Sequence, residues 1–288
     1  MNMSFEKRTE NKRTRSKVRK LLIFILTGLI ILTISIIGNR VEEERKERTF
    51  QVVLAEKIKK TSKEMDPYKE GKWHSEEDKS SESMRIVSSL KEENPDATGV
   101  LILPFQDRVF PILVSESGEY LRRNFEEKSS SCGSIFVDKE EFSSGSSTRI
   151  LYGHNMKSGN MFGFLDEYFD SEYAENGKDI SICWEGGAEK YELCGVVCVS
   201  SEDKSLEKEL LFPEKEDNEN LKEKMEKDGK IYRNFTENDH LIILATCEYS
   251  KKSGRLLVIF RKIWPGIQSD YFTLEVVCPL SGNYLSYL

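Results

Sequence analysis

The feature that most limits how this chain can fold is an uncharged run of 17 residues, Leu21–Ile37, near the N-terminus. As a helix the run covers about 25 Å, slightly less than the ~30 Å hydrocarbon core of a bilayer, so flanking residues such as Val18 or Gly38 would complete the span. The run therefore predicts a transmembrane anchor over residues 21–38. A cleaved signal peptide is the alternative, but the charged sequence that follows Gly38 does not resemble a small-residue cleavage site.

Charge is divided unevenly along the chain. Residues 1–20 contain eight Lys or Arg and two Glu, a net +6, which leaves −13 for the rest of a chain whose total is −7. Positive charge before an anchor marks the cytoplasmic side, so we expect a cytoplasmic basic tail over 1–20 and a main body outside the cell membrane. The acidic body also argues against nucleic acid as a partner.

Beyond residue 80 the sequence becomes strand-like. Short apolar or alternating runs bounded by turn residues lie at 99–105, 108–115, 133–138, 148–154, 179–185 and 190–200. Two later runs, 241–247 and 255–260, are separated by a polar turn that ends at Gly254, which is the pattern of a β-hairpin. Several short strands with long excursions predict a mainly β barrel or sandwich over residues 81–262.

Helices are expected on both sides of these strands. Residues 39–80 are predicted to form a stalk or linker whose helix, at 41–60, packs one apolar face on the domain. The apolar residues at helical spacing are Phe50, Val53, Leu54 and Ile58. Further helices are expected at 84–90, at 161–176 and within 200–238. Residues 263–288 are a C-terminal extension without an assigned role, in which 271–278 could add a strand.

The cysteines and histidines do not form a metal-binding pattern. The six cysteines are Cys132, Cys183, Cys194, Cys198, Cys247 and Cys278. They contain no Cys-x-x-Cys pair, the histidines are far apart, and no carboxylate pattern resembles a calcium loop, so no metal site is expected. All but Cys247 are expected to be small buried residues, because unreactive cysteines are among the most buried residue types.

Cys247 is different because it ends one strand of the predicted hairpin, while Arg255 begins the next. A cationic neighbour favours the thiolate, and a guanidinium group can also bind a developing oxyanion. His154 ends an apolar strand just before a loop that contains Gly and Asn, where scaffolds often present functional side chains. Each residue alone has an ordinary structural interpretation, but together they supply the nucleophile, acid or base and electrostatic group for acyl transfer. The other two histidines are His74, in a polar linker, and His240, too far along its strand to touch Cys247.

At these residues the sequence resembles the sortases of Gram-positive bacteria, class B in particular. The motifs that carry the resemblance are "YGHNM" at 152–156, "ATCEY" at 245–249 followed by Gly254-Arg255, and "GSIFVD" at 133–138. The resemblance covers roughly residues 80–262, and the order His, Cys, Arg is specific in that context. The charged segment within 200–238 is similar to the helix-bearing connection that precedes the catalytic cysteine in that class.

The resemblance implies an eight-stranded β-barrel with added helices and an extracytoplasmic cysteine transpeptidase that needs no cofactor. Cys247 would form a thioacyl intermediate after the threonine of a C-terminal sorting signal, His154 would transfer protons, and Arg255 would stabilise the oxyanion. The implied partners are surface proteins that carry such a signal and the amine of a cell-wall peptide precursor. Residues expected to contact substrate are Asn155, Ala245, Thr246 and Glu248.

Several alternatives remain at this stage. The acceptor could be a lysine of another subunit if the enzyme polymerises pili, or the chain could be a degenerate surface-binding or assembly protein that keeps the barrel without turnover. A papain-like protease places its cysteine before the histidine, which is the reverse of the order here. The chain also departs from the family pattern at Ala245, where many relatives have serine, and in the extension 263–288.

Overall fold

The computed structural model describes residues 3–64, 76–200, 217–236, 238–248 and 254–263. The chain divides into two compact units, Met1–Lys46 and Glu47–Leu288. The predicted strand at 271–278 lies outside the described residues, as do His74 and Cys278.

The first unit is made by the N-terminal part of a long helix, α1 (Met3–Glu64). Its apolar side chains are exposed, for example Phe24 at 77% and Ile31 at 68%, and the helix is long and apolar enough to be a candidate membrane span. The helix does not end after the predicted anchor but continues through Gly38. A single glycine costs a helix only about 1 kcal/mol, and the Glu- and Arg-rich residues that follow are good helix formers.

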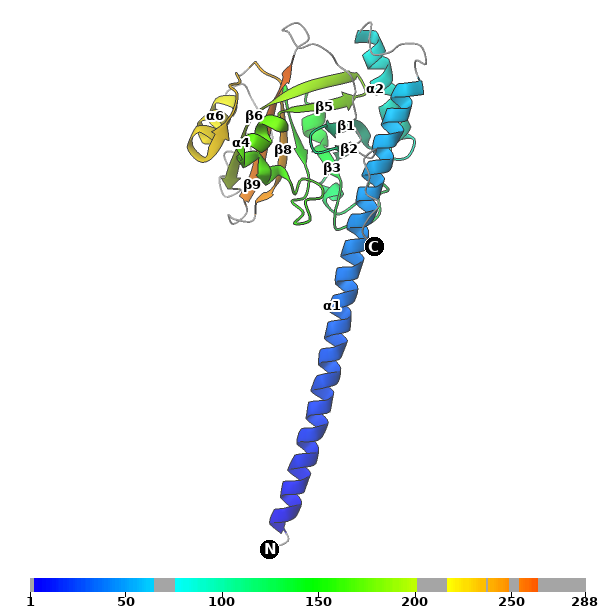
Figure 1. Ribbon diagram of the computed structural model, residues 1–288, viewed down its shortest axis with the longest axis vertical. Helices are drawn as coiled ribbons and strands as arrows, with labels where there is room; N and C mark the ends of the chain where they lie inside the picture. The colour runs from blue at the N-terminus through cyan, green and yellow to red at the C-terminus, as the bar shows by residue number, and fades with distance from the viewer. Residues whose placement is uncertain (1–2, 65–75, 201–216, 237, 249–253, 264–288) are drawn as a thin grey trace. The chain divides into compact units, whose positions relative to one another are not determined.

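The second unit is built on a closed ring of eight strands (Figure 1). The strands are β1 (Ala97–Leu103), β2 (Arg108–Ser115), β3 (Ile135–Asp138), β4 (Thr148–Tyr152), β5 (Asp179–Trp184), β6 (Gly187–Ser200), β8 (Leu241–Glu248) and β9 (Gly254–Ile263). Their order is β5-β1-β2-β3-β4-β8-β9-β6, and the pairing of β6 with β5 closes the ring. A short additional strand, β7 (Gly229–Ile231), pairs with β6. The predicted eight-stranded barrel with added helices is therefore confirmed.

Alternating side chains fill the inside of the barrel. Residues such as Leu101, Phe110, Leu244 and Val258 are completely buried in one cluster that receives side chains from strands around the ring. Because successive strand residues point to opposite faces, the neighbouring residues of the same strands face outward and need a cover. Helices provide that cover on two sides.

The first side, over β1 and β2, is covered by the last part of α1 and by α2 (Glu76–Lys91). Leu54 and Ile58 of α1 are 3% and 2% exposed in a cluster with residues of α2. The predicted apolar face of this stretch of α1 is thus largely correct, although Val53 is 56% exposed. The predicted helix at 84–90 is the C-terminal half of α2.

The second side is covered by α6 (Asp217–Asp228), which lies beside β6 in Figure 1. Leu221 and Met225 are buried there with outward-facing residues of β6, β8 and β9, including Ile243 and Ile259. The helix expected within 200–238 is therefore present, and residues 201–216 lie outside the described part of the chain.

The remaining helices are short: η1 (Glu119–Leu121), α3 (Lys139–Ser143), η2 (Leu165–Phe169) and α4 (Ser171–Asn176). The helix predicted at 161–176 begins only at Leu165, and it is divided into η2 and α4 because Asp170 between them has an extended backbone, with ψ at 130°. Its carboxylate accepts a hydrogen bond from the Tyr173 amide at 2.9 Å and so caps α4.

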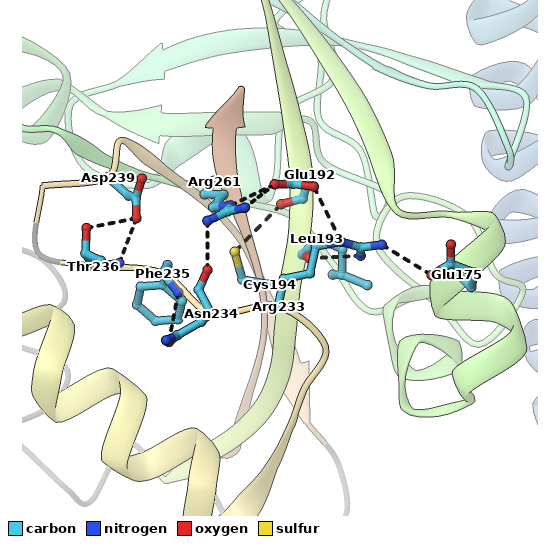
Figure 2. Close-up of polar contacts among 10 residues, drawn as sticks. All are labelled: Glu175, Glu192, Leu193, Cys194, Arg233, Asn234, Phe235, Thr236, Asp239 and Arg261. Atoms are coloured by element: carbon cyan, nitrogen blue, oxygen red, sulfur yellow. Dashed lines mark hydrogen bonds and ion pairs between the residues drawn. The ribbon is translucent and has the colours of Figure 1, made fainter. Parts of the chain in front are cut away.

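An ion-pair network holds the end of β9 that lies away from Arg255 (Figure 2). The carboxylate of Glu192 on β6 lies between the guanidinium groups of Arg261, at 2.8 Å from Nε, and Arg233, at 3.4 Å from Nε. Arg261 also donates to the carbonyl of Asn234, and Arg233 pairs with Glu175. The network thus links β6 and β9 to the segment that leads into β8.

Candidate active site

The parallel pairing of β4 with β8 brings two of the three predicted catalytic residues to one edge of the barrel. The last pair in the register is Tyr152 with Ala245, and the Gly153 amide then donates to the Ala245 carbonyl at 3.1 Å. His154 and Cys247 each lie two residues beyond this pair. Because parallel strands run in the same direction, both residues lie at the carboxyl ends of adjacent strands.

The antiparallel pairing of β8 with β9 brings in the third residue. Cys247 is directly opposite Arg255 in the register, followed by Glu248 opposite Gly254, so the predicted hairpin is confirmed. Arg255 is half-buried, and the side chains of Cys247 and Glu248 lie outside the described atoms. β8 therefore lies between β4 and β9, with an interstrand spacing of about 4.8 Å on each side.

The imidazole of His154 is held by a backbone carbonyl. Its Nε2 atom lies 2.6 Å from the carbonyl oxygen of Leu121 in η1. A carbonyl oxygen only accepts hydrogen bonds, so Nε2 carries the proton and donates. Nδ1 is therefore the ring nitrogen that this hydrogen bond does not use. This contact was not predicted, because a main-chain carbonyl has no side-chain signature in the sequence.

The helix η1 is fixed in place by the carboxylate of Glu119. It accepts hydrogen bonds from the Ser115 hydroxyl and the Ser117 amide, both at 2.9 Å. Partial burial raises the pKa of Glu119, but the combined hydrogen bonds outweigh burial and lower it to about 2. Gly118 begins η1 with φ at +74°, a left-handed conformation that favours glycine. Leu121, whose carbonyl binds His154, is the last residue of this helix.

The loop that follows His154 folds back as a small hairpin. The Phe162 amide donates to the His154 carbonyl at 3.0 Å, and Asn155 forms a bridge with Met161. A side chain at Gly163 would bring its Cβ within 2.0 Å of the Met156 carbonyl oxygen, so glycine is required there. Asn155, predicted to contact substrate, is half-buried beside His154 in this hairpin.

Two other residues predicted to contact substrate are buried in β8. Ala245 is 2% exposed and belongs to the outer cluster beneath α6, and Thr246 is 3% exposed opposite Leu256. The hydroxyl of Thr246 makes no hydrogen bond to any described residue. Their role in substrate binding, like that of Asn155 and Glu248, stays a prediction.

The other described cysteines fit the expected structural role. Cys132, Cys183 and Cys194 are buried, and Cys198 is half-buried. Burial raises the pKa of Cys183 to about 11 and that of Cys194 to about 12, so neither thiol ionises readily at neutral pH. In the described part of the chain, no three His, Cys, Asp or Glu side chains are grouped as a metal site.

Comparison with known proteins identifies the family. Residues 102–262, more than half of the chain, match the sortase domain. The chain belongs to the sortase family. This sortase is 31% identical to sortase B of Listeria monocytogenes over 180 residues, which cover 60% of this chain and 72% of that protein. It is 26% identical to sortase B of Staphylococcus aureus over 181 residues, covering 61% and 73% respectively.

The fold of this sortase agrees with that of solved relatives. The crystal structure of Clostridium perfringens sortase B matches with a TM-score of 0.55 and 29% identity, over 61% of this chain and 98% of that one. The predicted membership of class B is therefore confirmed, and with it the prediction of a cysteine transpeptidase.

Proposed function

We propose that this sortase is anchored by residues 21–38 with its barrel outside the cell, where it cleaves a C-terminal sorting signal after threonine. It then transfers the surface protein to an amine of cell-wall peptide. Cys247 is the nucleophile, His154 the proton donor and acceptor, and Arg255 the oxyanion-stabilising group. The observation that carries the proposal is the strand register, which pairs Cys247 with Arg255 and brings the end of β4, two residues before His154, beside β8.

The proposed reaction has two acyl-transfer steps. The Cys247 thiolate attacks the carbonyl carbon of the signal's threonine, and the C–N bond breaks as His154 gives a proton to the leaving amine. An acceptor amine then attacks the thioester and transfers its proton to His154. The C–S bond breaks, the Cys247 thiolate leaves, and a new amide forms. Each step passes through an oxyanion that the guanidinium group of Arg255 can bind.

Two features of the site support these roles. The hydrogen bond to the Leu121 carbonyl fixes the His154 ring with Nδ1 available for the proton transfers. The backbone pairing of Cys247 with Arg255 on adjacent strands supports a cation near the proposed nucleophile, and such a neighbour favours the thiolate.

Intact-mass spectrometry tests the proposal. The full chain in detergent is incubated with a panel of sorting-signal peptides, in parallel with the Cys247→Ala variant. We expect an added mass equal to the peptide fragment that ends at threonine, on the wild-type chain but not on the variant. An adduct that persists in Cys247→Ala would remove the nucleophile assignment. No adduct with any peptide, from a folded wild-type chain, would favour a binding or assembly protein without turnover.

A further inference from the structure

Two guanidinium groups bind three successive residues in the hairpin that follows His154. Arg48 of α1 donates from Nε to the side-chain oxygen of Asn160 at 2.7 Å and from Nη2 to the Ser158 carbonyl at 3.1 Å. Arg108 of β2 donates from Nη1 to the Gly159 carbonyl between them at 2.6 Å. Asn160 is only 2% exposed, so water competes little with the bond from Arg48.

The same turn of α1 also contacts the segment that contains Leu121, whose carbonyl binds the His154 ring. The ring of Phe50 stacks on Phe125, with centroids 5.2 Å apart and an interplanar angle of 30°. Phe125 follows η1 by a few residues, and the Leu121 carbonyl of η1 holds the His154 ring. Arg48 and Phe50 therefore reach both segments that determine where the imidazole lies.

The position of this turn is set by the packing of α1 that follows it. Leu54 and Ile58 are buried against Ile86 and Leu90 of α2 and against the outer face of the barrel. Arg48 thus extends from a helix whose register on the barrel is already fixed by apolar contacts. Its planar fork presents donors at fixed angles to the two acceptors in the hairpin.

We propose that Arg48 is a positioning residue for His154, through its bonds to Asn160 and Ser158 in the hairpin. The proposal deepens the proposed function and rests on it, since it assumes that His154 transfers protons. Without Arg48 the hairpin loses two of its three guanidinium contacts, and the imidazole spends less time in the productive position. Such a loss lowers kcat more than KM, because it affects proton transfer rather than the surface that binds peptide.

The test uses the full chain in detergent and three variants. Arg48→Ala removes both bonds to the hairpin, and Arg48→Lys keeps the charge but not the fork. Lys57→Ala is the matched control, since Lys57 lies nine residues further along α1 and forms an ion pair with Glu93 at 2.7 Å. All variants and the wild type are assayed for peptide adduct, for kcat and KM, and for hydrogen exchange of peptides that cover 153–163.

We expect Arg48→Ala to lower kcat by about tenfold with KM changed less than about twofold, and to speed exchange of the Phe162 amide that donates to His154. Arg48→Lys should fall between Arg48→Ala and the wild type, and Lys57→Ala should match the wild type in both measurements. The split between kcat and KM and the partial rescue by lysine would not follow from a loss of stability alone.

The proposal is overturned if Arg48→Ala has the same kcat and the same exchange in 153–163 as Lys57→Ala. Should Arg48→Ala fail to fold, Arg48→Lys takes its place, and equality with Lys57→Ala overturns the proposal in the same way. A wild-type chain that forms no adduct would instead contradict the proposed function, so the two failures are told apart in one experiment.

Discussion

The position of Arg255 is set by the antiparallel pairing of β9 with β8. Arg255 lies on the strand that follows the proposed nucleophile, and its backbone is directly opposite that of Cys247 in the antiparallel register. A guanidinium at this position offers two donors in one plane to a developing oxyanion, whereas an ammonium offers a single point charge. The proposed role therefore depends on the shape of the side chain as well as on its charge.

Arg255→Lys should lower kcat by about 10²-fold while the chain stays folded, because loss of a preorganised oxyanion donor has effects of that order. Steady-state transpeptidation with a peptide that forms the adduct measures the change. Arg261→Lys is a matched control on the same strand, since Arg261 binds Glu192 in the network at the other end of β9. That control should lower the melting temperature and leave kcat nearly unchanged. Wild-type kcat in Arg255→Lys would contradict the oxyanion role.

What the sequence reveals about the site depends on which atom of a residue acts. The positions of His154, Cys247 and Arg255 at strand ends were predictable because each adjoins an apolar run that predicts a strand. Their catalytic roles stay a proposal. The carbonyl of Leu121 was not predictable, since any residue has a carbonyl and only the fold brings this one to the imidazole. Arg48 was missed because a charged residue in a stalk helix is ordinarily solvated, and its contacts are more than 100 residues away in the chain.

At the scale of the elements, β4 depends on a side chain from outside the sheet. The register of β3 with β4 contains the single pair Phe136 with Tyr152. The Ile150 amide instead donates to the carboxylate of Glu141 in α3. Glu141 is 2% exposed, and burial raises its pKa to about 8, although the bond from Ile150 favours the charged form. One carboxyl group thus replaces a missing backbone partner in the strand that leads to His154.

Glu141→Gln should weaken the pH dependence of stability. The folded chain keeps the Glu141 proton up to about pH 8, whereas the unfolded carboxyl loses it near its ordinary pKa of 4.5. Between these values the wild type loses up to about 1.4 kcal/mol of unfolding free energy per pH unit as pH rises, and the glutamine variant lacks this contribution. Glutamine can still accept from the Ile150 amide. Melting temperatures at pH 5 and pH 8 measure the difference, and equal pH dependence in both chains would contradict it.

The strands were more predictable than the elements between them. All eight strands of the ring coincide with apolar runs. A strand that is buried on both faces is apolar along its length, and a run of a few apolar residues is enough to predict it. The three residues of β7 have no such pattern, and their pairing with β6 depends on tertiary structure. The continuation of α1 through Gly38 was missed because a change in composition was interpreted as the end of an element.

At the scale of the whole molecule, the distribution of charge and apolar surface favours one orientation in the membrane. The exposed apolar part of α1 is a candidate span, preceded by a net charge of +6 and followed by the acidic remainder of the chain. A sorting reaction at the cell surface needs the barrel outside, which is the orientation that the basic tail favours. The anchor, the charge asymmetry and the proposed site are therefore consistent with one another.

That orientation can be tested with tags at both ends of the chain. In intact protoplasts treated with external protease, we expect the C-terminal tag to be lost while a short fragment with the N-terminal tag survives, because the proposed orientation keeps residues 1–20 in the cytoplasm. Replacing the eight Lys and Arg of residues 1–20 by Gln should reduce the protected fraction, since those charges hold the tail inside. A wild-type chain whose C-terminal tag resists protease would contradict the orientation. A mature chain that begins after Gly38 would instead identify the apolar run as a cleaved signal, and the barrel would then be released from its anchor.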